Sequence, residues 1–321
     1  MWEFSIFRAL GLMVRTWPFV LLRALVYLAI AVALVVTAGA GAWIGAVLAG
    51  LWMQPNSTSA GLWGGAVGLA LGVLVVALLR GRLLYRVTTG HLAVMVEALD
   101  GRPLPLGTGQ IALGRAIVAD RFGDAPALLA LDKLVRGVIR TATGLVDGLL
   151  VDILPIAVLD RLARATGLHL RLALWLIEGV VLAHATRTRS ENAWEAAHDG
   201  LVLYTQNARP LITNALWLSL FGWALAGVVA LAALSPAATV AAALPEVPWT
   251  APLLAAVLGW AVKAALYDPL ALACMLQLHL RLTEGQDPLP EWRGRLTQVS
   301  DKFRHLGERA LGWRSGTAQD A

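Results

Sequence analysis

Cysteine, charge and catalytic motifs are all scarce in this sequence. Cys274 is the single cysteine among 321 residues, which excludes an intrachain disulfide and a cysteine-based metal cluster. Charged residues make up 15% of the chain, against about 25% in ordinary soluble domains. The six histidines have no metal-binding H-x-x-x-H or H-x-x-E-H spacing, and neither a G-x-S-x-G motif nor a P-loop occurs. We therefore expect no cofactor, no metal and no enzymatic activity.

One dipeptide, His198-Asp199, resembles the metal-binding dyad of phosphohydrolases. That chemistry needs further His and Asp ligands at suitable separations, and the sequence does not provide them. We interpret His198 as a solvated residue on a helix. A lipid-modifying enzyme would need both residues to lie in a polar cavity.

Apolar residues are abundant where charge is scarce. They make up 58% of the chain, and the mean hydropathy is +0.68. Several apolar runs reach the ~20 residues that cross a bilayer core. Four runs qualify as spans: Ala24–Trp52, Leu62–Leu79, Leu211–Leu234 and Trp249–Leu280. The pattern predicts an all-α integral membrane protein with four transmembrane helices plus cytoplasmic amphipathic or interfacial helices.

The placement of basic residues predicts the topology. No lysine or arginine occurs from Ala24 to Leu79 or from Leu211 to Val262, so both connections within the hairpins lack basic charge. Of the 26 basic residues, all but Lys263 lie in the other segments. By the positive-inside rule, both termini and the central segment are cytoplasmic. We expect a multi-pass protein of the bacterial inner (plasma) membrane.

These spans divide the chain into four parts. Residues 1–85 form an N-terminal amphipathic helix and the first hairpin, and residues 86–210 form a cytoplasmic or interfacial helical segment. Residues 211–284 form the second hairpin, and residues 285–321 form a C-terminal cytoplasmic amphipathic helix. Within the second part, Leu172–Ala185 is apolar but only fourteen residues long, with basic residues at both ends. That pattern favours an interfacial or re-entrant helix over a fifth span.

Two segments outside the spans show helical amphipathicity. Pro126–Thr143 places its apolar residues on one face and its charged residues on the other, so this helix lies on the membrane surface or covers the bundle. In the tail, a 4-3-4-3-4 spacing joins Trp292, Leu296, Val299, Phe303, Leu306 and Ala310. This pattern covers fewer than three heptads, which is short for a coiled coil. It favours an amphipathic helix folded back on its own protomer.

Glycines predict close helix packing. Gly64, Gly68 and Gly72 repeat every fourth residue in the second span, and Gly41 and Gly45 do so in the first. Without a Cβ, two backbones can approach closely in a membrane. The spacing does not tell whether the partner helix belongs to the same protomer.

Charged residues inside the last span mark a candidate site. Lys263 lies ~20 Å along the helix from Trp249, so it falls within the hydrocarbon. A charge there costs about 2.5–3.5 kcal/mol on insertion scales and needs a partner. Asp268 is one candidate: residues five apart share a helix face poorly, but Pro269 frees the carbonyl of Ala265, and a kink there would help the two side chains to meet. Glu178 is the second candidate. The group is either a structural ion pair or an intramembrane polar site.

Two stretches carry a family resemblance. They are SENAWEAAHDGLVLYTQNARPLITNALWL (190–218) and DPLALACMLQLHLRLTEG (268–285). They resemble a family of uncharacterised bacterial multi-span membrane proteins and, more distantly, the C-terminal part of choline transporter-like proteins. The resemblance implies a cytoplasmic helix before the last hairpin. It covers a small part of the chain, which lacks most of that family's spans, so choline transport is not implied and no functional residue is carried over.

Two functions from different classes fit these features. The first is a homo-oligomeric transport or channel protein for an unknown small solute or ion, with its polar site at Lys263, Asp268 and Glu178. The second is a non-catalytic membrane scaffold that binds lipid or protein partners. Membrane lipids are expected partners of both, and nucleic acid of neither. A solvent-connected cavity at the charged residues would favour transport, whereas a closed pair would favour the scaffold.

Overall fold

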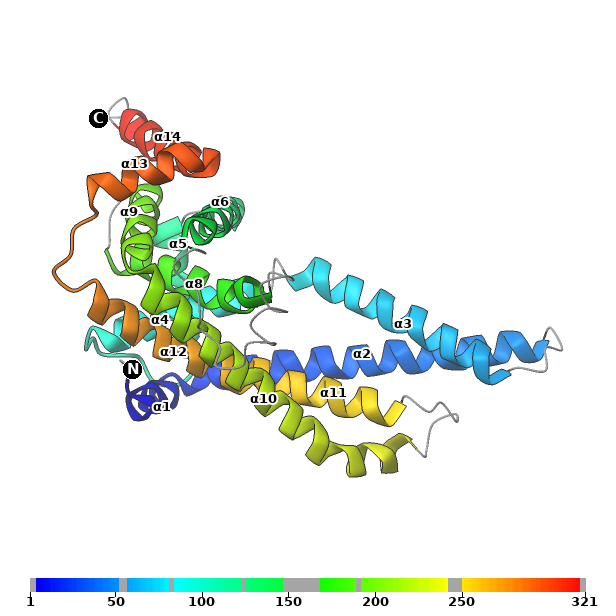
Figure 1. Cartoon of the computed structure of the whole chain (residues 1–321). Coiled ribbons are helices and arrows are strands. Elements are labelled where there is room, and N and C mark those ends of the chain that lie inside the picture. Colours follow the sequence, from blue (N-terminus) through cyan, green and yellow to red (C-terminus); the bar gives the residue numbers. More distant parts are fainter. Residues whose placement is uncertain are drawn as a thin grey trace. The chain divides into compact units, whose positions relative to one another are not determined.

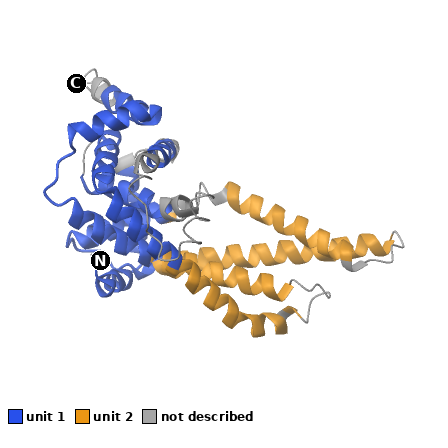
Figure 2. Ribbon diagram, in the orientation of Figure 1, with its two compact units in different colours: residues 1–19, 88–220, 270–321 blue, residues 20–87, 221–269 orange. Residues whose placement is uncertain are grey.

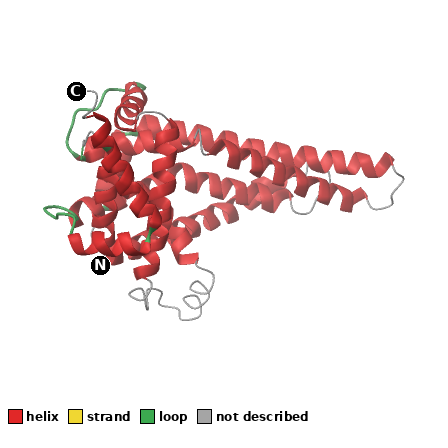
Figure 3. Cartoon of the chain, turned by 90° about the horizontal axis from the view of Figure 1, so that it is seen from above, coloured by secondary structure: helices red, strands yellow, loops and turns green. Residues whose placement is uncertain are grey.

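Helices account for nearly all of the structure. The computed structural model describes residues 4–51, 57–80, 84–122, 125–146, 168–188, 192–241 and 250–317 (Figure 1). No strand occurs within these ranges (Figure 3), so the all-α prediction is confirmed for the described chain. Trp52 and Trp249, the expected ends of two spans, lie outside the described residues.

Four helical stretches in the described chain are long and apolar enough to cross a membrane, as predicted. They are Trp17–Leu51, Ser59–Leu78, Ala208–Thr239 and Thr250–Leu282. The first three lie in helices α2 (Trp17–Leu51), α3 (Ser57–Arg80) and α10 (Ala208–Ala241). The fourth joins α11 (Thr250–Val262), a π-helical turn η2 (Lys263–Tyr267) and α12 (Asp268–Leu282). The chain is therefore a membrane protein with four candidate spans.

The remaining helices are shorter or more polar. They are α1 (Ile6–Arg15), α4 (Leu84–Leu99), α5 (Gly109–Phe122), α6 (Ala125–Val146), α8 (Leu168–Arg187), α9 (Ala193–Gln206), α13 (Pro290–Val299) and α14 (Asp301–Thr317). Side chains cap α1 and α9 in the expected way, because Ser5 accepts from the amide of Arg8 and Asn192 from those of Trp194 and Glu195.

The helices group into two compact units (Figure 2). Unit 1 comprises residues 1–19, 88–220 and 270–321, and unit 2 comprises residues 20–87 and 221–269. Helices α2 and α10 and the last apolar stretch each contribute residues to both units. From Phe221 to Ala241 and from Thr250 to Pro269, unit 2 holds runs close to the ~20 residues of a bilayer span. Helix α10 and the last apolar stretch are thus longer than one span, because the rest of each belongs to unit 1.

In unit 2, the predicted glycines form a close contact between α2 and α3. A Cβ on Gly41 would overlap the carbonyl oxygen of Gly64, and a Cβ on Gly68 would overlap that of Thr37. Gly45 and Gly72 are equally closed, against Ala60 and the hydroxyl of Thr37. Both helices belong to one chain, so the structure assigns this contact to the protomer itself.

In unit 1, α8 lies in the protein core, a packing position that the sequence did not predict; its interfacial or re-entrant placement in the membrane stays a prediction. Leu176, Ile177, Val180 and Val181 are at most 1% exposed, because α8 packs against α6 and α9. A short helix that is apolar all round is typical of a protein core. The apolar face of α6 also points inward, where Val138 and its neighbours pack on this core and not on a membrane surface.

The tail folds back on its own protomer, as the apolar seam predicted. Leu296, Phe303 and Leu306 are fully buried, and α14 packs on α6 and α9. The seam is not one helix, however. Ser300 is extended between α13 and α14 and its hydroxyl accepts from the amide of Phe303, so it begins a second helix. Val299, a predicted seam residue, is consequently exposed.

The α2–α3 contact predicts opposite effects for two neighbouring glycines. Gly41→Ala should lower the melting temperature and the folded yield, because the obstacle is a backbone carbonyl that no rotamer change can move; overpacking typically costs about 1–3 kcal/mol. Gly39→Ala is the matched control, since no heavy atom lies within 4 Å of the place that its new methyl group would occupy. It should be neutral or slightly stabilising. Equal melting curves for the two variants, followed by tryptophan fluorescence in detergent, would contradict this contact.

Candidate functional site

The most unusual polar feature of unit 2 is a buried ion pair in the last apolar stretch. Lys263 Nζ donates to Asp268 Oδ1 at 2.7 Å, and the two side chains are only 7% and 15% exposed. The structure therefore brings together two of the three residues predicted for the polar site. Lys263 also lies over the ring of Trp223, 5.0 Å from its centroid, which adds a cation–π contact.

The π-helical turn explains how residues five apart can meet. On a regular α-helix, five residues rotate the chain by about 500°, which leaves the two side chains ~140° apart. In η2 the amide of Asp268 donates to the carbonyl of Lys263, an i to i−5 bond, so the two residues lie one above the other. The expected proline kink is therefore not needed, because the wider turn aligns the pair.

Arg23 supplies a hydrogen bond that Pro269 cannot make. In the π register, the amide after that of Asp268 would donate to the carbonyl of Ala264, but residue 269 is proline and has no N–H. Arg23 Nη2 donates to this carbonyl at 3.1 Å. Arg23 is 4% exposed and also lies near the ring of Tyr27, one turn further along α2. A buried guanidinium thus ties the first span to the turn that holds the ion pair.

The space next to the pair is filled by protein. A Cβ on Gly222 of α10 would lie 2.6 Å from the ring of Tyr267 and 3.2 Å from Lys263 Cε. Even a methyl group therefore has no room on this side. With both side chains largely buried, the pair is closed on the side that α10 covers.

Glu178, the third predicted residue, has a different partner. It lies in α8 of unit 1, where its carboxylate is 3.1 Å from Arg136 of α6. Glu178 is 9% exposed, whereas the side chain of Arg136 is 43% exposed, so only the carboxylate of this pair is buried. The helical pattern of α6 places Arg136 on its charged face. The Glu178 carboxylate of α8 binds the guanidinium group of Arg136 there.

Ring contacts inside unit 1 involve His184, His198 and His279. His198, expected to be solvated, is stacked on Phe303 at 4.0 Å between ring centroids, and Arg293 binds the neighbouring Asp199 at 2.7 Å. His184 meets His279 edge to face at 5.8 Å. No group of three metal-ligating side chains occurs in the described part of the chain. The interpretation of His198 as a solvated residue was wrong, because Phe303 covers its ring. The sequence could not show this contact, since the two residues are about a hundred positions apart.

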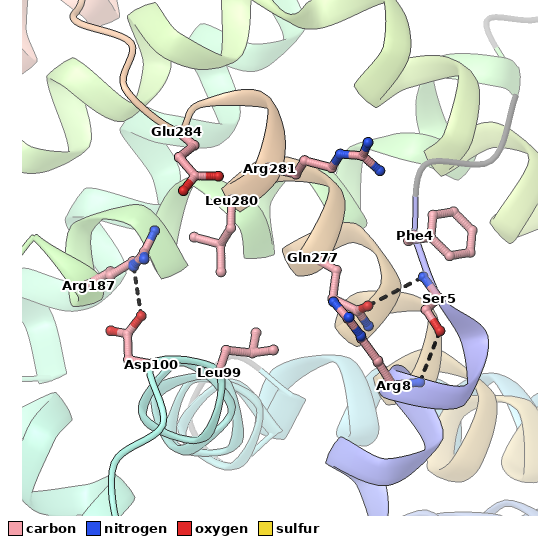
Figure 4. Close-up of a pocket in the computed structure, with 10 residues that line it drawn as sticks. All are labelled: Phe4, Ser5, Arg8, Leu99, Asp100, Arg187, Gln277, Leu280, Arg281 and Glu284. Carbon is pink, nitrogen blue, oxygen red and sulfur yellow. Dashed lines mark hydrogen bonds and ion pairs between the residues drawn. The ribbon is translucent and has the colours of Figure 1, made fainter.

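A polar cleft of about 770 Å³ opens in unit 1, between the start of α1, the end of α4 and the end of α12 (Figure 4). Its charged and polar lining is Ser5, Arg8, Asp100, Arg187, Gln277, Arg281 and Glu284, and its apolar lining is Phe4, Leu99 and Leu280. Arg187 is held by Asp100 at 2.9 Å, and Gln277 accepts from the amide of Ser5 at 3.4 Å. The lining carries three guanidinium and two carboxylate groups, a set that suits a ligand with an anionic group.

Comparisons with family models, with curated proteins and with solved structures gave no match for this chain. The resemblance to choline transporter-like proteins therefore stays a prediction, and the candidate sites are judged on their geometry alone.

Arg23 and Pro269 should be energetically coupled. Arg23→Met should lower the melting temperature, because it leaves the Ala264 carbonyl without a donor, a loss of about 1–3 kcal/mol for a buried group. In a Pro269→Ala background, the restored N–H can take that carbonyl, so the same arginine substitution should cost less. A double-mutant cycle on melting temperatures measures the difference. Strictly additive effects would show that the arginine does not replace the missing amide donor.

His184 should make unit 1 sensitive to acid. Burial lowers the pKa of His184 below its ordinary value; Asp199 opposes this shift and Arg187 adds to it. The unfolded chain therefore takes up a proton near pH 6.5, whereas the folded chain does not. Stability is fully present above that pH and falls as the pH decreases, by at most about 1.4 kcal/mol per pH unit for one group. Melting between pH 7.5 and 5.5 should be less pH-dependent in His184→Gln; parallel curves would contradict this assignment.

Proposed function

We propose that this chain is a non-catalytic membrane scaffold, anchored by its four spans, whose unit 1 provides the binding surface for lipid or protein partners. The single observation that carries this proposal is the closed state of the Lys263–Asp268 pair. A largely buried pair at 2.7 Å, with no room for a methyl group beside it, has the properties of a structural lock. The polar cleft, by contrast, belongs to unit 1.

The lock fits a scaffold on energetic grounds. A buried ion pair contributes little net stability over apolar residues, but removing one partner leaves an unpaired charge and is strongly destabilising. Such a pair selects one packing arrangement of the helices and disfavours others. Arg23 extends this selection to α2, because its contact with Ala264 joins the first and last spans. A fixed bundle of this kind serves an anchor better than a moving gate.

A transport or channel function is the second candidate, and the π-helical turn favours it. Ionisable residues inside spans often mark ion or solute pathways, and single π turns are frequent at functional sites. Here two buried cations, Arg23 and Lys263, accompany one carboxylate, Asp268. In this version, opening of the pair would admit a small solute or ion. A homo-oligomer in the bacterial inner membrane with both termini cytoplasmic belongs to this proposal as well.

Oligomerisation has one argument in its favour and one against it. In the most apolar 18-residue window of each candidate span, 22% to 33% of the residues are buried within the chain, so part of the helical surface is left for lipid or for further copies. The glycines at positions 41, 45, 64, 68 and 72, however, are already used between α2 and α3. Any contact between protomers would therefore use other faces of the spans.

Substitutions in the pair separate the two functions. On the scaffold proposal, Lys263→Met should lower the stability of the folded protein by about 3–5 kcal/mol. Lys263→Met combined with Asp268→Asn should recover a large part of this loss, because no charge is then left unpaired. Melting in detergent and the size-exclusion profile measure both effects. A single variant as stable as the double variant would contradict a structural lock.

Flux completes the test. Proteoliposomes that contain the wild-type chain should be no more permeable to K⁺, Cl⁻ or H⁺ than protein-free vesicles, and the double variant should behave identically. Ion flux above the protein-free level that Lys263→Met abolishes, while the protein keeps its melting temperature, would overturn the scaffold proposal and support transport.

A further inference from the structure

Helix α1 presents an uncovered apolar face. Ala9 and Leu12 are buried in unit 1, and so is Thr16, whose hydroxyl lies 2.9 Å from His91 Nε2. At 100° per residue, the opposite side of the helix carries four large apolar residues. They are Ile6, Phe7, Leu10 and Val14, and all are exposed, Phe7 by 86% and Val14 by 71%. A ten-residue helix therefore has one side on the protein and the other side free.

The position of α1 in the chain limits what can cover this face. Thr16 alone separates α1 from α2, the first candidate span, and its backbone is not helical, so the chain turns there. The end of α1 thus lies within a few ångströms of the start of the span, and the whole helix is only ~15 Å long. Trp17, which begins the span, is also exposed and is a residue type enriched at membrane interfaces.

Charge on the flank of α1 points to phospholipid. Arg8 and Arg15 lie together on one edge of the helix, between the buried and the apolar sides, and both are exposed. An in-plane helix with an apolar face and basic residues at its edge fits the boundary between acyl chains and headgroups. Ser5 and Arg8 also line the polar cleft. Its three guanidinium groups outnumber its two carboxylates, one of which binds Arg187, and Phe4 and Leu280 add apolar surface.

We propose that α1 lies flat in the interface of the bilayer that its own spans cross, and that the cleft beside Arg8 holds the phosphate-bearing headgroup of a phospholipid. The apolar face contacts acyl chains, and the guanidinium groups of the cleft bind the phosphate oxygens, which suit planar, multiple-donor recognition. This inference rests on the scaffold proposal, whose lipid partner and binding surface it names. Its failure would leave the Lys263–Asp268 pair, which is tested by melting and flux, unaffected.

Nitroxide labels test the position of the helix. In a Cys274→Ala background, single cysteines at Phe7, Val14 and, as a control on α14, the exposed Glu308 are labelled in full-length protein in phospholipid nanodiscs. The labels at positions 7 and 14 should collide more with O₂ than with a water-soluble nickel chelate, and the label at 308 should do the reverse. A label at position 7 that collides mainly with the nickel chelate would overturn the proposal. Shielding from both reagents with dipolar broadening would also overturn it, since a second copy would then cover the face.

Thermal shift tests the cleft and the source of the phosphate. In a neutral detergent, a short-chain phosphatidylglycerol should raise the melting temperature by about 2–4 °C, whereas inorganic phosphate should not. Arg8→Gln should remove most of this shift, while Arg295→Gln, an exposed arginine on α13, should keep it. An equal shift with inorganic phosphate would assign the cleft to a free anion. A shift that survives Arg8→Gln, or the absence of any shift, would show that the cleft does not bind the headgroup.

Discussion

The rule that no polar group can stay unpaired in an apolar setting governs unit 2. Lys263 would be costly on its own, so it requires Asp268, and a regular helix would hold the two apart. The wider π turn brings them together, but its register points one carbonyl at a proline. That carbonyl then requires Arg23 from another span. Each contact thus pairs a polar group that the preceding one leaves without a partner. Together these contacts join the first and last spans.

Much of the architecture could be predicted from the sequence because it follows local periodicity. The four spans come from the length of apolar runs, and the amphipathic α6 and the apolar seam of the tail come from the spacing of apolar residues along the chain. The glycines of α2 and α3 also predicted a close helix contact, although the sequence could not show which chain supplies the partner helix. The structure assigns it to the same protomer, since Gly41 and Gly64 touch.

What sequence reasoning missed depends on contacts between distant segments or on local register. The apolar segment of α8 was too short for a span, and only its packing against α6 and α9 shows that it is a core helix. The predicted site omits Arg23 because the uninterrupted apolar run begins after it, at Ala24. An arginine six residues inside a 35-residue apolar helix is the signal that could have found it. No residue spacing predicts a π turn, so the geometry that pairs Lys263 with Asp268 could not be predicted from the sequence.

The π turn also changes how the faces of the last apolar stretch must be assigned. A helical wheel drawn from Thr250 to Leu282 with one constant angle gathers residues that do not share a side. The wider turn adds roughly one residue to the count without adding a full turn, so the wheel before Lys263 and the wheel after Tyr267 differ in phase by about 100°. The faces of this stretch are therefore assigned with one helical wheel for α11 and another for α12. One extra residue in a turn can in this way change which side of a span every later residue occupies.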